Sequence, residues 1–379
     1  MTVGFDGIRT VNSESELCYY DRLFISSIGM EYPRDSFMVY APENSSDRAL
    51  SWLLSISSVH LKTPYKAFSK WMWRNCGGIF TDFHRHGVKV YHGIDSVLPL
   101  CSSGKDKVRM VTTVRDLTFK RLMKDYTMPE KFFRSWRIGR ACKRADRIIA
   151  TSEYVKNAII KKYGTSTDKI DVIYTAYRDE YIENLGDPVF VQNSKGKYNL
   201  PSNFILAITD FGTLSNLETL YKAFAKIENK RIDLVIIGKK NDYYRQLKHL
   251  AEKLNIDDRI VRVSKVNKHH FMSLYSLSKA LVEPSLADGI GQCVVEAMVS
   301  GTPVIASDDG CHREIAKDAA LYFEPDDVEQ LARHLNTVLN DSDKRKTLTD
   351  KGKELAKQFT QHNMAQNTML TYNKARGKA

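Results

Sequence analysis

The hydrophobic positions of this chain alternate between short β-branched runs and longer segments with helical spacing. In the first half, five apolar runs predict strands: "TVGFDGI", "VKVYHG", "VRMVTTV", "RIIATS" and "DVIYTA". A helix is equally clear at residues 153–163, which carry one apolar face between an N-cap at Ser152 and a stop at Gly164. Strands that alternate with helices predict an α/β fold, with parallel sheets and helices on both faces.

The alternation lapses over residues 179–203, where "DEYIENLGDPVFVQNSKGKYNLPSN" is rich in Gly, Asn, Pro and charge. This composition predicts a linker. A second alternation follows, so we predict two doubly wound, Rossmann-like domains, 1–178 and 204–361. We expect the C-terminal helix, 362–379, to pack back on the first domain. Ligands of such sheets bind beyond the carboxyl ends of the strands.

Length and composition agree with two globular domains, at 379 residues, 42% hydrophobic and 27% charged. No apolar run approaches the roughly 20 residues of a membrane-spanning helix, and "MTVGFDGIRTV" does not have the pattern of a signal peptide. The cysteines lack the paired spacing of metal sites, which indicates reduced thiols in a cytoplasmic protein: Cys18, Cys76, Cys101, Cys142, Cys293 and Cys311.

The formal net charge of +12 indicates an anionic partner. In the densest basic segment, side chains recur every three or four residues and form a stripe along one predicted helix: Lys131, Arg134, Arg137, Arg140, Arg144 and Arg147. The apolar residues expected to face inward are Phe133, Trp136, Ile138, Ala141 and Cys142. The stripe is interpreted either as a solvated helix face or as a contact with a phosphorylated acceptor or anionic lipid, which would place the protein peripherally at the inner membrane face.

Two other function classes fit the sequence poorly. A nucleic-acid-binding protein would suit the charge, but there is no recognition motif, and the aromatic residues are not interleaved with the basic stripe as a stacking platform requires. A dinucleotide-dependent oxidoreductase would carry a glycine fingerprint after a strand, and no strand here is followed by one.

The stretch "ALVEPSLADGIGQCVVEAMVSGTPVIASDDG" carries candidate chemistry, because a strand, the turn "LADGIG" and a helix follow one another in it. Gly289 and Gly291 leave backbone N–H groups beside a helix N-terminus, which favours a diphosphate. Glu296 suits a vicinal diol such as a ribose, and Asp288 would reach hydroxyls of the group that the diphosphate carries. The alternative is that Glu296 is an ordinary first-turn acid and Asp288 a loop residue.

This stretch, followed by "REIAKDAALYFEPDDVEQLARHL", resembles the C-terminal signature of retaining glycosyltransferases of family 4, with its acid-x7-acid motif. The likeness extends to "ILAITDFGTLSNLETLYKAFAKI", "VYHGIDSVLPL", "VTTVRDLTF" and "ADRIIATSEYVKNAII". The family implies the GT-B architecture and a retaining, metal-independent hexosyl or pentosyl transfer in polysaccharide or glycoconjugate synthesis. A nucleotide diphosphate-sugar would be the donor, no cofactor would be required, and the acceptor would be a glycan or a lipid-linked molecule.

The resemblance also implies two sets of site residues. The catalytic set combines one acid of the second domain with residues of the first: Asp288, Arg115, Asp116 and His92. The donor-binding set lies in the second domain, and within it Glu296 would bind the ribose. Its members are Glu296, Gly289, Ile290, Gly291, Asp210, Ser215, Asn216, Lys239 and Lys240.

Three positions depart from the family pattern. Asp288 replaces a glutamate, which sets the carboxylate back by roughly 1.5 Å. Arg115 replaces the histidine of a His-Asp pair and is expected to clamp a phosphate or an acidic sugar. The loop at Leu214 lacks the Arg/Lys pair that commonly holds the diphosphate, so we expect Lys239, Lys240 or Arg115 to supply that charge. These departures leave an alternative open, a catalytically silent partner subunit or sugar-nucleotide-binding protein.

Overall fold

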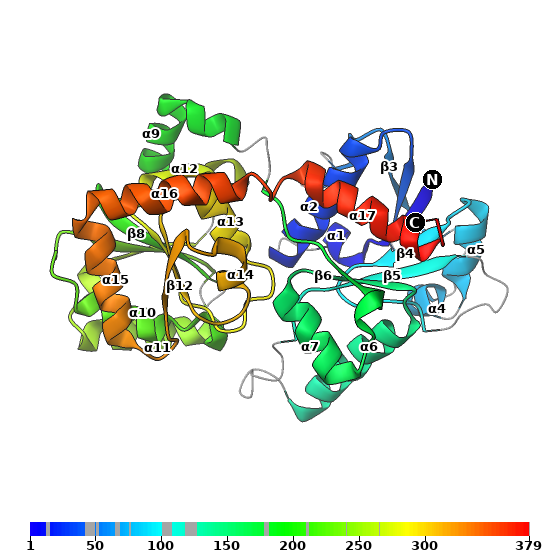
Figure 1. The fold of residues 1–379 in the computed structure, drawn as a ribbon, viewed down its shortest axis with the longest axis horizontal. Helices are drawn as coiled ribbons and strands as arrows, with labels where there is room; N and C mark the ends of the chain where they lie inside the picture. Colours follow the sequence, from blue (N-terminus) through cyan, green and yellow to red (C-terminus); the bar gives the residue numbers. More distant parts are fainter. Residues whose placement is uncertain are drawn as a thin grey trace. The chain divides into compact units, whose positions relative to one another are not determined.

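The computed structural model describes most of the chain: residues 1–12, 16–41, 50, 53–64, 69–75, 77–100, 108–117, 127–177, 182–209, 212–239, 241–264 and 266–378. These residues form two compact units. The first comprises the described residues of 1–117 and 127–175 together with 361–378, and the second those of 176–360. Each unit is a parallel sheet covered by helices (Figure 1).

The described part of the first unit contains a seven-stranded parallel sheet in the order β3-β2-β1-β4-β5-β6-β7. Its strands are β1 (Thr2–Asp6), β2 (Ser36–Tyr40), β3 (Val59–Lys62), β4 (Val90–Gly93), β5 (Arg109–Val114), β6 (Arg147–Ala150) and β7 (Ile170–Val172). Its helices are α1 (Ile8–Asn12), α2 (Glu16–Glu31), α4 (Lys70–Asn75), α5 (Gly78–Arg85), α6 (Met128–Arg144), α7 (Glu153–Tyr163), η2 (Thr167–Lys169) and α17 (Gln361–Ala375). The winding direction reverses between β1 and β4, as in a doubly wound sheet.

The structure confirms the five strands predicted in this half as β1, β4, β5, β6 and β7. The predicted helix is confirmed as α7, where the Ser152 hydroxyl accepts the Val155 N–H at 3.2 Å and Gly164 ends the helix with φ 62°. Strands β2 and β3 were not predicted, because "SFMVY" and "VHLK" are short runs without a clear alternation.

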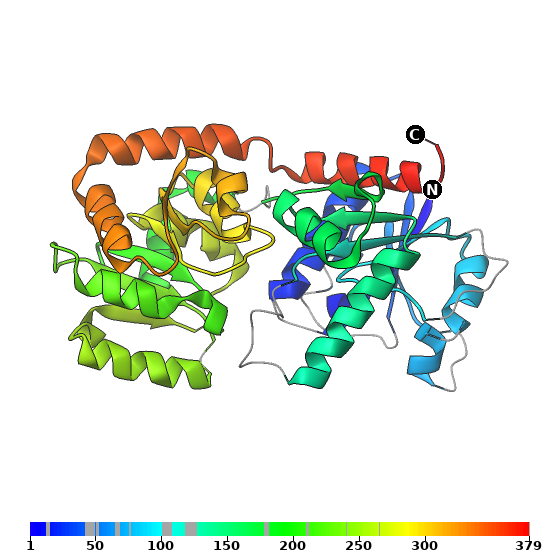
Figure 2. The same cartoon turned by 60° about the horizontal axis from the view of Figure 1, so that its bottom comes forward.

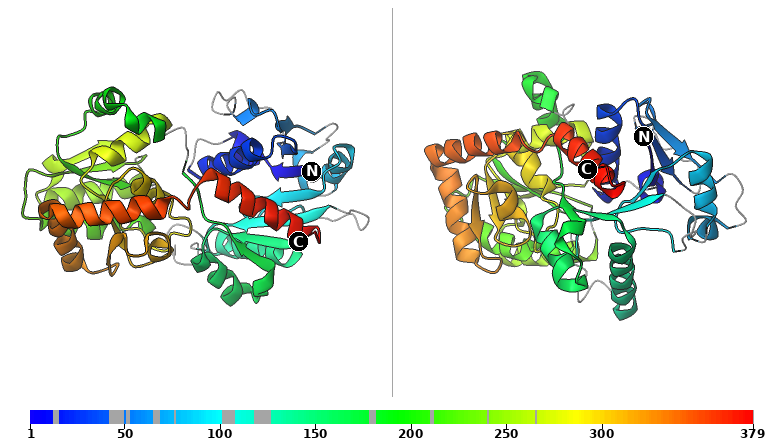
Figure 3. Two further views of the ribbon diagram at one scale, coloured as in Figure 1. Left: turned by 45° about the horizontal axis from the view of Figure 1, so that its top comes forward. Right: turned by 45° about the vertical axis from the view of Figure 1, so that its right-hand side comes forward.

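Helix α17 belongs to the first unit, although it follows the second unit in the chain. It packs along α2, as the red and blue helices in the left view of Figure 3 show. The hydroxyl of Tyr372 lies 2.7 Å from Nδ1 of His92 on β4, and the Thr371 hydroxyl donates to Asp171 at 3.1 Å. These contacts attach the end of the chain to the first sheet.

The described part of the second unit contains a six-stranded parallel sheet in the order β10-β9-β8-β11-β12-β13. Its strands are β8 (Phe204–Ile208), β9 (Asp233–Ile237), β10 (Ile260–Val263), β11 (Leu281–Glu283), β12 (Val304–Ser307) and β13 (Ala320–Phe323). Its helices are η3 (Glu183–Gly186), α9 (Pro188–Lys197), η4 (Thr213–Ser215), α10 (Leu217–Ala225), α11 (Asp242–Lys253), η5 (Asp257–Arg259), η6 (Lys268–His270), α12 (Phe271–Leu277), α13 (Gln292–Val299), α14 (His312–Ala316), α15 (Val328–Asn340) and α16 (Ser342–Ala356).

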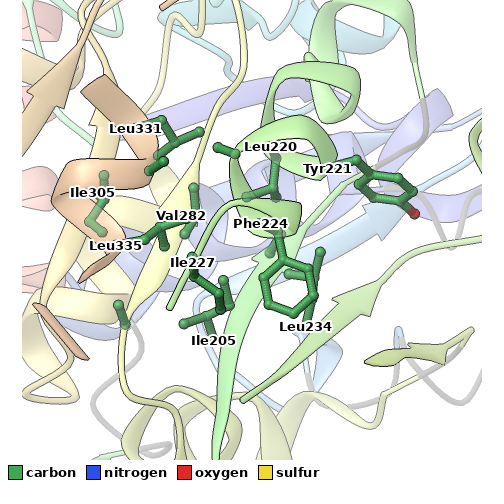
Figure 4. Close-up of a cluster of buried hydrophobic side chains, with 14 of the residues drawn as sticks. Ile205, Leu220, Tyr221, Phe224, Ile227, Leu234, Val282, Ile305, Leu331 and Leu335 are labelled. Atoms are coloured by element: carbon green, nitrogen blue, oxygen red, sulfur yellow. The ribbon is translucent and has the colours of Figure 1, made fainter. Parts of the chain in front are cut away.

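The core of the second unit lies between one face of this sheet and the helices α10 and α15 (Figure 4). Sheet and helix side chains interleave there with almost no exposed surface: Ile205, Val282 and Ile305 from the strands, and Leu220, Phe224, Leu331 and Leu335 from the helices. Burial of this apolar surface fixes β11 in the middle of the sheet, between β8 and β12. The turn and the helix α13 that follow β11 carry the acidic motif.

Residues 182–203 are not the linker that the sequence predicts, because they form η3 and α9 within the second unit. Asp187 caps α9, and its carboxylate accepts two N–H groups of the first turn at 2.9 and 3.2 Å. Phe190 stacks on His270, with ring centroids 4.8 Å apart. A helix cap and contacts with His270 therefore organise a segment whose composition is typical of a loop.

Among the described helices, none combines the length and the apolar composition needed to cross a bilayer. The described cysteines are free thiols: Cys18, Cys142, Cys293 and Cys311. Cys76 and Cys101 lie outside the described residues.

Candidate functional site

The turn after β11 is closed by the side chain of its own acid. The Asp288 carboxylate accepts the N–H of Ile290 at 2.8 Å and that of Gly291 at 3.1 Å. The turn reaches this shape because Ala287 and Gly291 both adopt left-handed backbone angles, with φ 63° and 71°. Two of the amides that the sequence assigns to a diphosphate are therefore bonded to Asp288 in this structure.

The loop after β12 packs directly on this turn. The Cys311 N–H donates to the Asp288 carbonyl at 2.8 Å. Gly310, with φ 68°, lies so close that a β-carbon on it would collide with the backbone of Asp288. The carboxyl ends of the neighbouring strands β11 and β12 are thus joined at Asp288, which keeps a quarter of its side chain exposed.

A buried histidine lies behind Asp288. Nε2 of His312 is 3.5 Å from Asp288 Oδ2, and Nδ1 is 3.0 Å from the Ser307 carbonyl. Burial by itself lowers the pKa of His312, but the carboxylates of Asp288 and Glu283 outweigh burial and raise that pKa to about 9. The imidazole is therefore held as a cation at neutral pH.

The pKa values of Asp288 and Glu283 are shifted in opposite directions. Burial raises the pKa of Asp288, but hydrogen bonding to His312 and to the turn amides outweighs burial and leaves that pKa below its usual value. Glu283, at the end of β11, has a raised pKa, because burial and the neighbouring Asp288 charge together exceed the effect of His312. The surroundings of Asp288 thus favour its ionised form.

Glu296 lies on α13 with only 7% of its surface exposed. Its Oε2 accepts the Tyr275 hydroxyl at 3.0 Å, and its Oε1 accepts Nε2 of Gln292 at 2.7 Å. The Gln292 amide also donates to the Ala176 carbonyl at 3.2 Å. The Tyr275 hydroxyl and the Gln292 amide thus fix the position of the Glu296 carboxylate from the protein side.

The loop at residues 212–216 lies beside the acidic turn. The Leu286 N–H donates to the Leu214 carbonyl at 2.8 Å. The Ser215 hydroxyl donates to the Gly212 carbonyl at 2.6 Å, and the Asn216 amide donates to the Pro325 carbonyl at 2.9 Å. The side chains of Ser215 and Asn216 therefore shape this loop. Lys239, at the end of β9, is exposed, whereas Asp210 and Lys240 lie outside the described residues.

The structure corrects two expectations for the first unit. Arg115 is 1% exposed, forms ion pairs with Asp21 at 2.9 Å and Asp95 at 3.2 Å, and lies over the Tyr20 ring. Two carboxylates already balance its charge, so it is placed as a buried structural cation and not as the expected phosphate clamp.

His92 is also a core residue, with no exposed surface. Its Nδ1 lies 2.7 Å from the Tyr372 hydroxyl, and its Nε2 lies 2.7 Å from the Thr113 hydroxyl. Burial lowers its pKa to about 3. The expectation that His92 presents a polar group to a ligand is wrong, because both ring nitrogens are used inside the first unit. Asp116, which follows β5, is half-buried.

The basic segment at 131–147 differs from its prediction as well. Ile138, Ala141 and Cys142 are buried as expected, but Phe133 and Trp136 are exposed. Arg147 is not part of the helix, because it begins β6 and pairs with Asp171. The helical period of 3.6 residues places these two aromatic residues on a different side of the helix from Cys142. The buried face predicted from the sequence therefore included two residues too many.

Several residues of the site were not found by sequence reasoning: His312, Tyr275, Gln292 and Glu283. One signal was present for His312, because it follows β12 at the same sheet edge where Asp288 follows β11. Tyr275 and Gln292 carried no such signal. They reach Glu296 from α12 and from the preceding turn of α13.

Two doubly wound units, each a parallel sheet covered by helices, have the architecture of the GT-B fold. Residues 36–181 match the family model "Glycosyltransferase Family 4", and residues 191–355 match "Glycosyl transferases group 1". The chain belongs to this family of glycosyltransferases.

Named relatives agree with this assignment. The O-antigen chain mannosyltransferase RfbU of Salmonella typhimurium is 30% identical over 198 residues, which are 52% of each chain. The O-antigen chain mannosyltransferase B of Escherichia coli is 25% identical over 75% of this chain and 74% of its own. The alignment thus spans about half of the first relative and three quarters of the second. Anabaena Alr3699/HepE, solved in complex with UDP and glucose, has the same fold, with a TM-score of 0.76 at 16% identity over 99% of this chain and 100% of its own.

Proposed function

We propose that this protein is a retaining glycosyltransferase that moves a sugar from a nucleotide diphosphate-sugar to a glycan or lipid-linked acceptor in polysaccharide synthesis, without a metal. One observation carries the proposal: Tyr275 and Gln292 fix the carboxylate of Glu296 on the helix that starts at the Asp288 turn. Two relatives are named O-antigen mannosyltransferases, which makes a mannosyl donor the first one to test.

In this proposal Glu296 accepts hydrogen bonds from the two ribose hydroxyls of the donor, and the ionised Asp288 accepts one from the donor sugar. The family resemblance implies that a glutamate is usual at the Asp288 position. The shorter side chain here is turned back onto the amides of Ile290 and Gly291. A donor sugar that reaches Asp288 must therefore enter close to the turn itself.

The diphosphate is proposed to lie at the N-terminus of α13, where backbone N–H groups and the helix dipole favour an anion. Two turn amides already bond to Asp288, so we propose that the exposed Lys239, together with Lys240 and the loop from Asp210 to Asn216, completes this site. Fixed amide dipoles and lysine charges would stabilise the departing diphosphate while positive charge develops on the sugar.

Isothermal titration calorimetry with UDP, GDP and their sugars tests the donor site. We expect one nucleotide series to bind, and Glu296→Gln to weaken that binding by roughly tenfold or more, because a charged acceptor is lost. Glu329→Gln, on the exposed face of α15, is the matched control and should bind as the wild type does. Equal binding by Glu296→Gln would reject the ribose role.

Turnover with the donor that binds tests the reaction, and the anomeric configuration of the product, read by NMR, tests retention. Binding without turnover across a panel of acceptors would favour a sugar-nucleotide-binding protein. Absence of binding to every nucleotide would favour a partner subunit.

We further propose that the acceptor is lipid-linked and is reached at the cytoplasmic face of a membrane. The net charge of +12 supports an anionic environment of this kind. The O-antigen names of the two relatives support a surface-polysaccharide pathway.

A further inference from the structure

Helix α6 presents a row of large apolar side chains to solvent. Met128 and Phe132 are 73% and 74% exposed, Phe133 is 60% exposed, and Trp136 is 45% exposed. Single exposed apolar residues are common on protein surfaces, but four on three consecutive turns of one helix form a continuous patch. We call these four residues the α6 aromatic face.

The α6 aromatic face lies opposite the side by which the helix is anchored. The buried residues of α6 are Ile138, Ala141 and Cys142, all in its C-terminal half. A rotation of about 100° per residue places Phe132 and Trp136 roughly on the opposite side of the helix from them. The N-terminal half of α6, the long teal helix in Figure 2, therefore offers its aromatic residues outward and buries none of them.

A groove runs along this face between α6 and the end of α7. Its volume is about 460 Å³, and it is lined by Phe132, Ser135, Trp136, Gly139, Arg140, Lys143 and Tyr163. Gly139 brings the two helices together, because a β-carbon on it would lie 2.9 Å from the Tyr163 ring. Aromatic walls and cationic ends make the groove suited to an amphiphile with an apolar chain and an anionic head.

The charge around the α6 aromatic face is mainly positive. Residues 128–144 carry six basic side chains and a single acid, Glu130, which caps the helix with Thr127. Lys143 is exposed beside the groove, and the Arg140 guanidinium lies 5.8 Å from the centre of the Trp136 ring. The apolar patch is therefore bordered by positive charge.

We propose that α6 is a membrane-docking helix, with Phe132 and Trp136 entering the headgroup region of an anionic bilayer and the positive charge of the helix attracting it to lipid phosphates. Aromatic side chains beside lysine and arginine are the composition of interfacial membrane contacts. A second copy of this chain fits less well, because lysine is depleted from protein interfaces and two such helices would repel each other. This inference adds a membrane contact to the proposed lipid-linked acceptor, and the purpose of the contact rests on that proposed function. Lipid binding itself is measured without the sugar donor.

Flotation with phosphatidylcholine–phosphatidylglycerol vesicles tests the proposal on the full chain. We expect the wild type to bind these vesicles and to bind pure phosphatidylcholine vesicles roughly tenfold more weakly. The Phe132→Ser, Trp136→Ser double variant should bind the anionic vesicles roughly tenfold more weakly than the wild type. Lys131→Gln with Lys143→Gln should produce a similar loss, which added salt should reproduce in the wild type.

Leu370→Ser is the matched control, because Leu370 is 56% exposed on α17 of the same unit and should not alter binding. Lys131 is half-buried and the other substituted positions are exposed, so thermal unfolding should show that the variants remain folded. Vesicles with brominated acyl chains should quench the wild-type tryptophan fluorescence, and Trp136→Phe should lose most of that quenching.

Vesicle binding that is absent in the wild type, or unchanged in the double aromatic variant, would overturn the proposal. So would a concentration-dependent dimer, seen by analytical ultracentrifugation, that the same variant abolishes without any vesicle binding. Nucleotide binding, measured in parallel, distinguishes the docking-helix proposal from the proposed glycosyl transfer. A protein that binds donor nucleotide but no vesicles rejects the docking helix alone, and one that binds vesicles but no nucleotide rejects the proposed reaction alone.

Discussion

Nε2 of His312 lies 3.5 Å from Oδ2 of Asp288, beneath the turn that connects β11 to α13. The same carboxylate accepts the N–H groups of Ile290 and Gly291, so a cation and two amides hold it from the protein side. His312 therefore acts as a positioning residue for Asp288. The pair ties the ends of two neighbouring strands together at the point where the donor is proposed to bind.

The charge on His312 predicts a loss of stability at high pH. A histidine whose pKa is raised from 6.5 to about 9 by folding contributes stability that is present below pH 6.5 and lost as the pH rises through 9. Between these limits the wild type should lose on the order of 3 kcal/mol of unfolding free energy that His312→Gln does not lose. Urea unfolding at both ends of this range measures the difference. An equal change in unfolding free energy for the two proteins over this pH range would show that His312 is not held as a cation.

His92 predicts the opposite dependence. Its pKa is lowered to about 3 by burial, so it contributes stability above pH 6.5 that is lost as the pH falls toward 3. Acidification to about pH 4 should cost the wild type on the order of 3 kcal/mol more than His92→Gln. Tyr372→Phe keeps the imidazole buried and should retain the wild-type pH slope. A slope that Tyr372→Phe flattens as much as His92→Gln would assign the effect to another group.

Tyr275 is expected to affect donor binding without touching the donor. Tyr275→Phe removes the hydrogen bond from the Tyr275 hydroxyl to Glu296, so the carboxylate gains freedom that binding must restrict. The dissociation constant of the nucleotide should rise by roughly fivefold to tenfold, equivalent to about 1 kcal/mol. Tyr221→Phe, another buried tyrosine of the second unit, is the control. If both variants bind the nucleotide equally well, the Tyr275 hydroxyl does not position Glu296.

Arg115 is expected to act on stability. Arg115→Met leaves the carboxylate of Asp21, which is 2% exposed, without its cation in the core of the first unit. The free energy of unfolding should fall by about 3–5 kcal/mol. Asp21→Asn in the same background should recover part of that loss, because the unpaired charge is then absent. Normal stability combined with lost turnover would instead return Arg115 to the reaction.

The sequence by itself determined the two α/β units and the position of the acidic motif. Both follow from local chemistry, because strand and helix periods, caps such as Ser152 and glycine turns are set by residues close together in the chain. The resemblance to family 4 rested on the same local stretch around Asp288 and Glu296. Composition was less reliable over residues 179–203, where the cap at Asp187 and a ring contact with His270 favour a helix.

Only the tertiary structure decided what each polar residue does. His92 and Arg115 have the residue types of a reactive site, but their partners Tyr372 and Asp21 lie 280 and 94 positions away. His312 gained its role in the same way, through a loop that meets Asp288 from the next strand. Burial and pairing change the charge and the availability of a side chain, and both depend on groups that the fold brings together from distant parts of the chain.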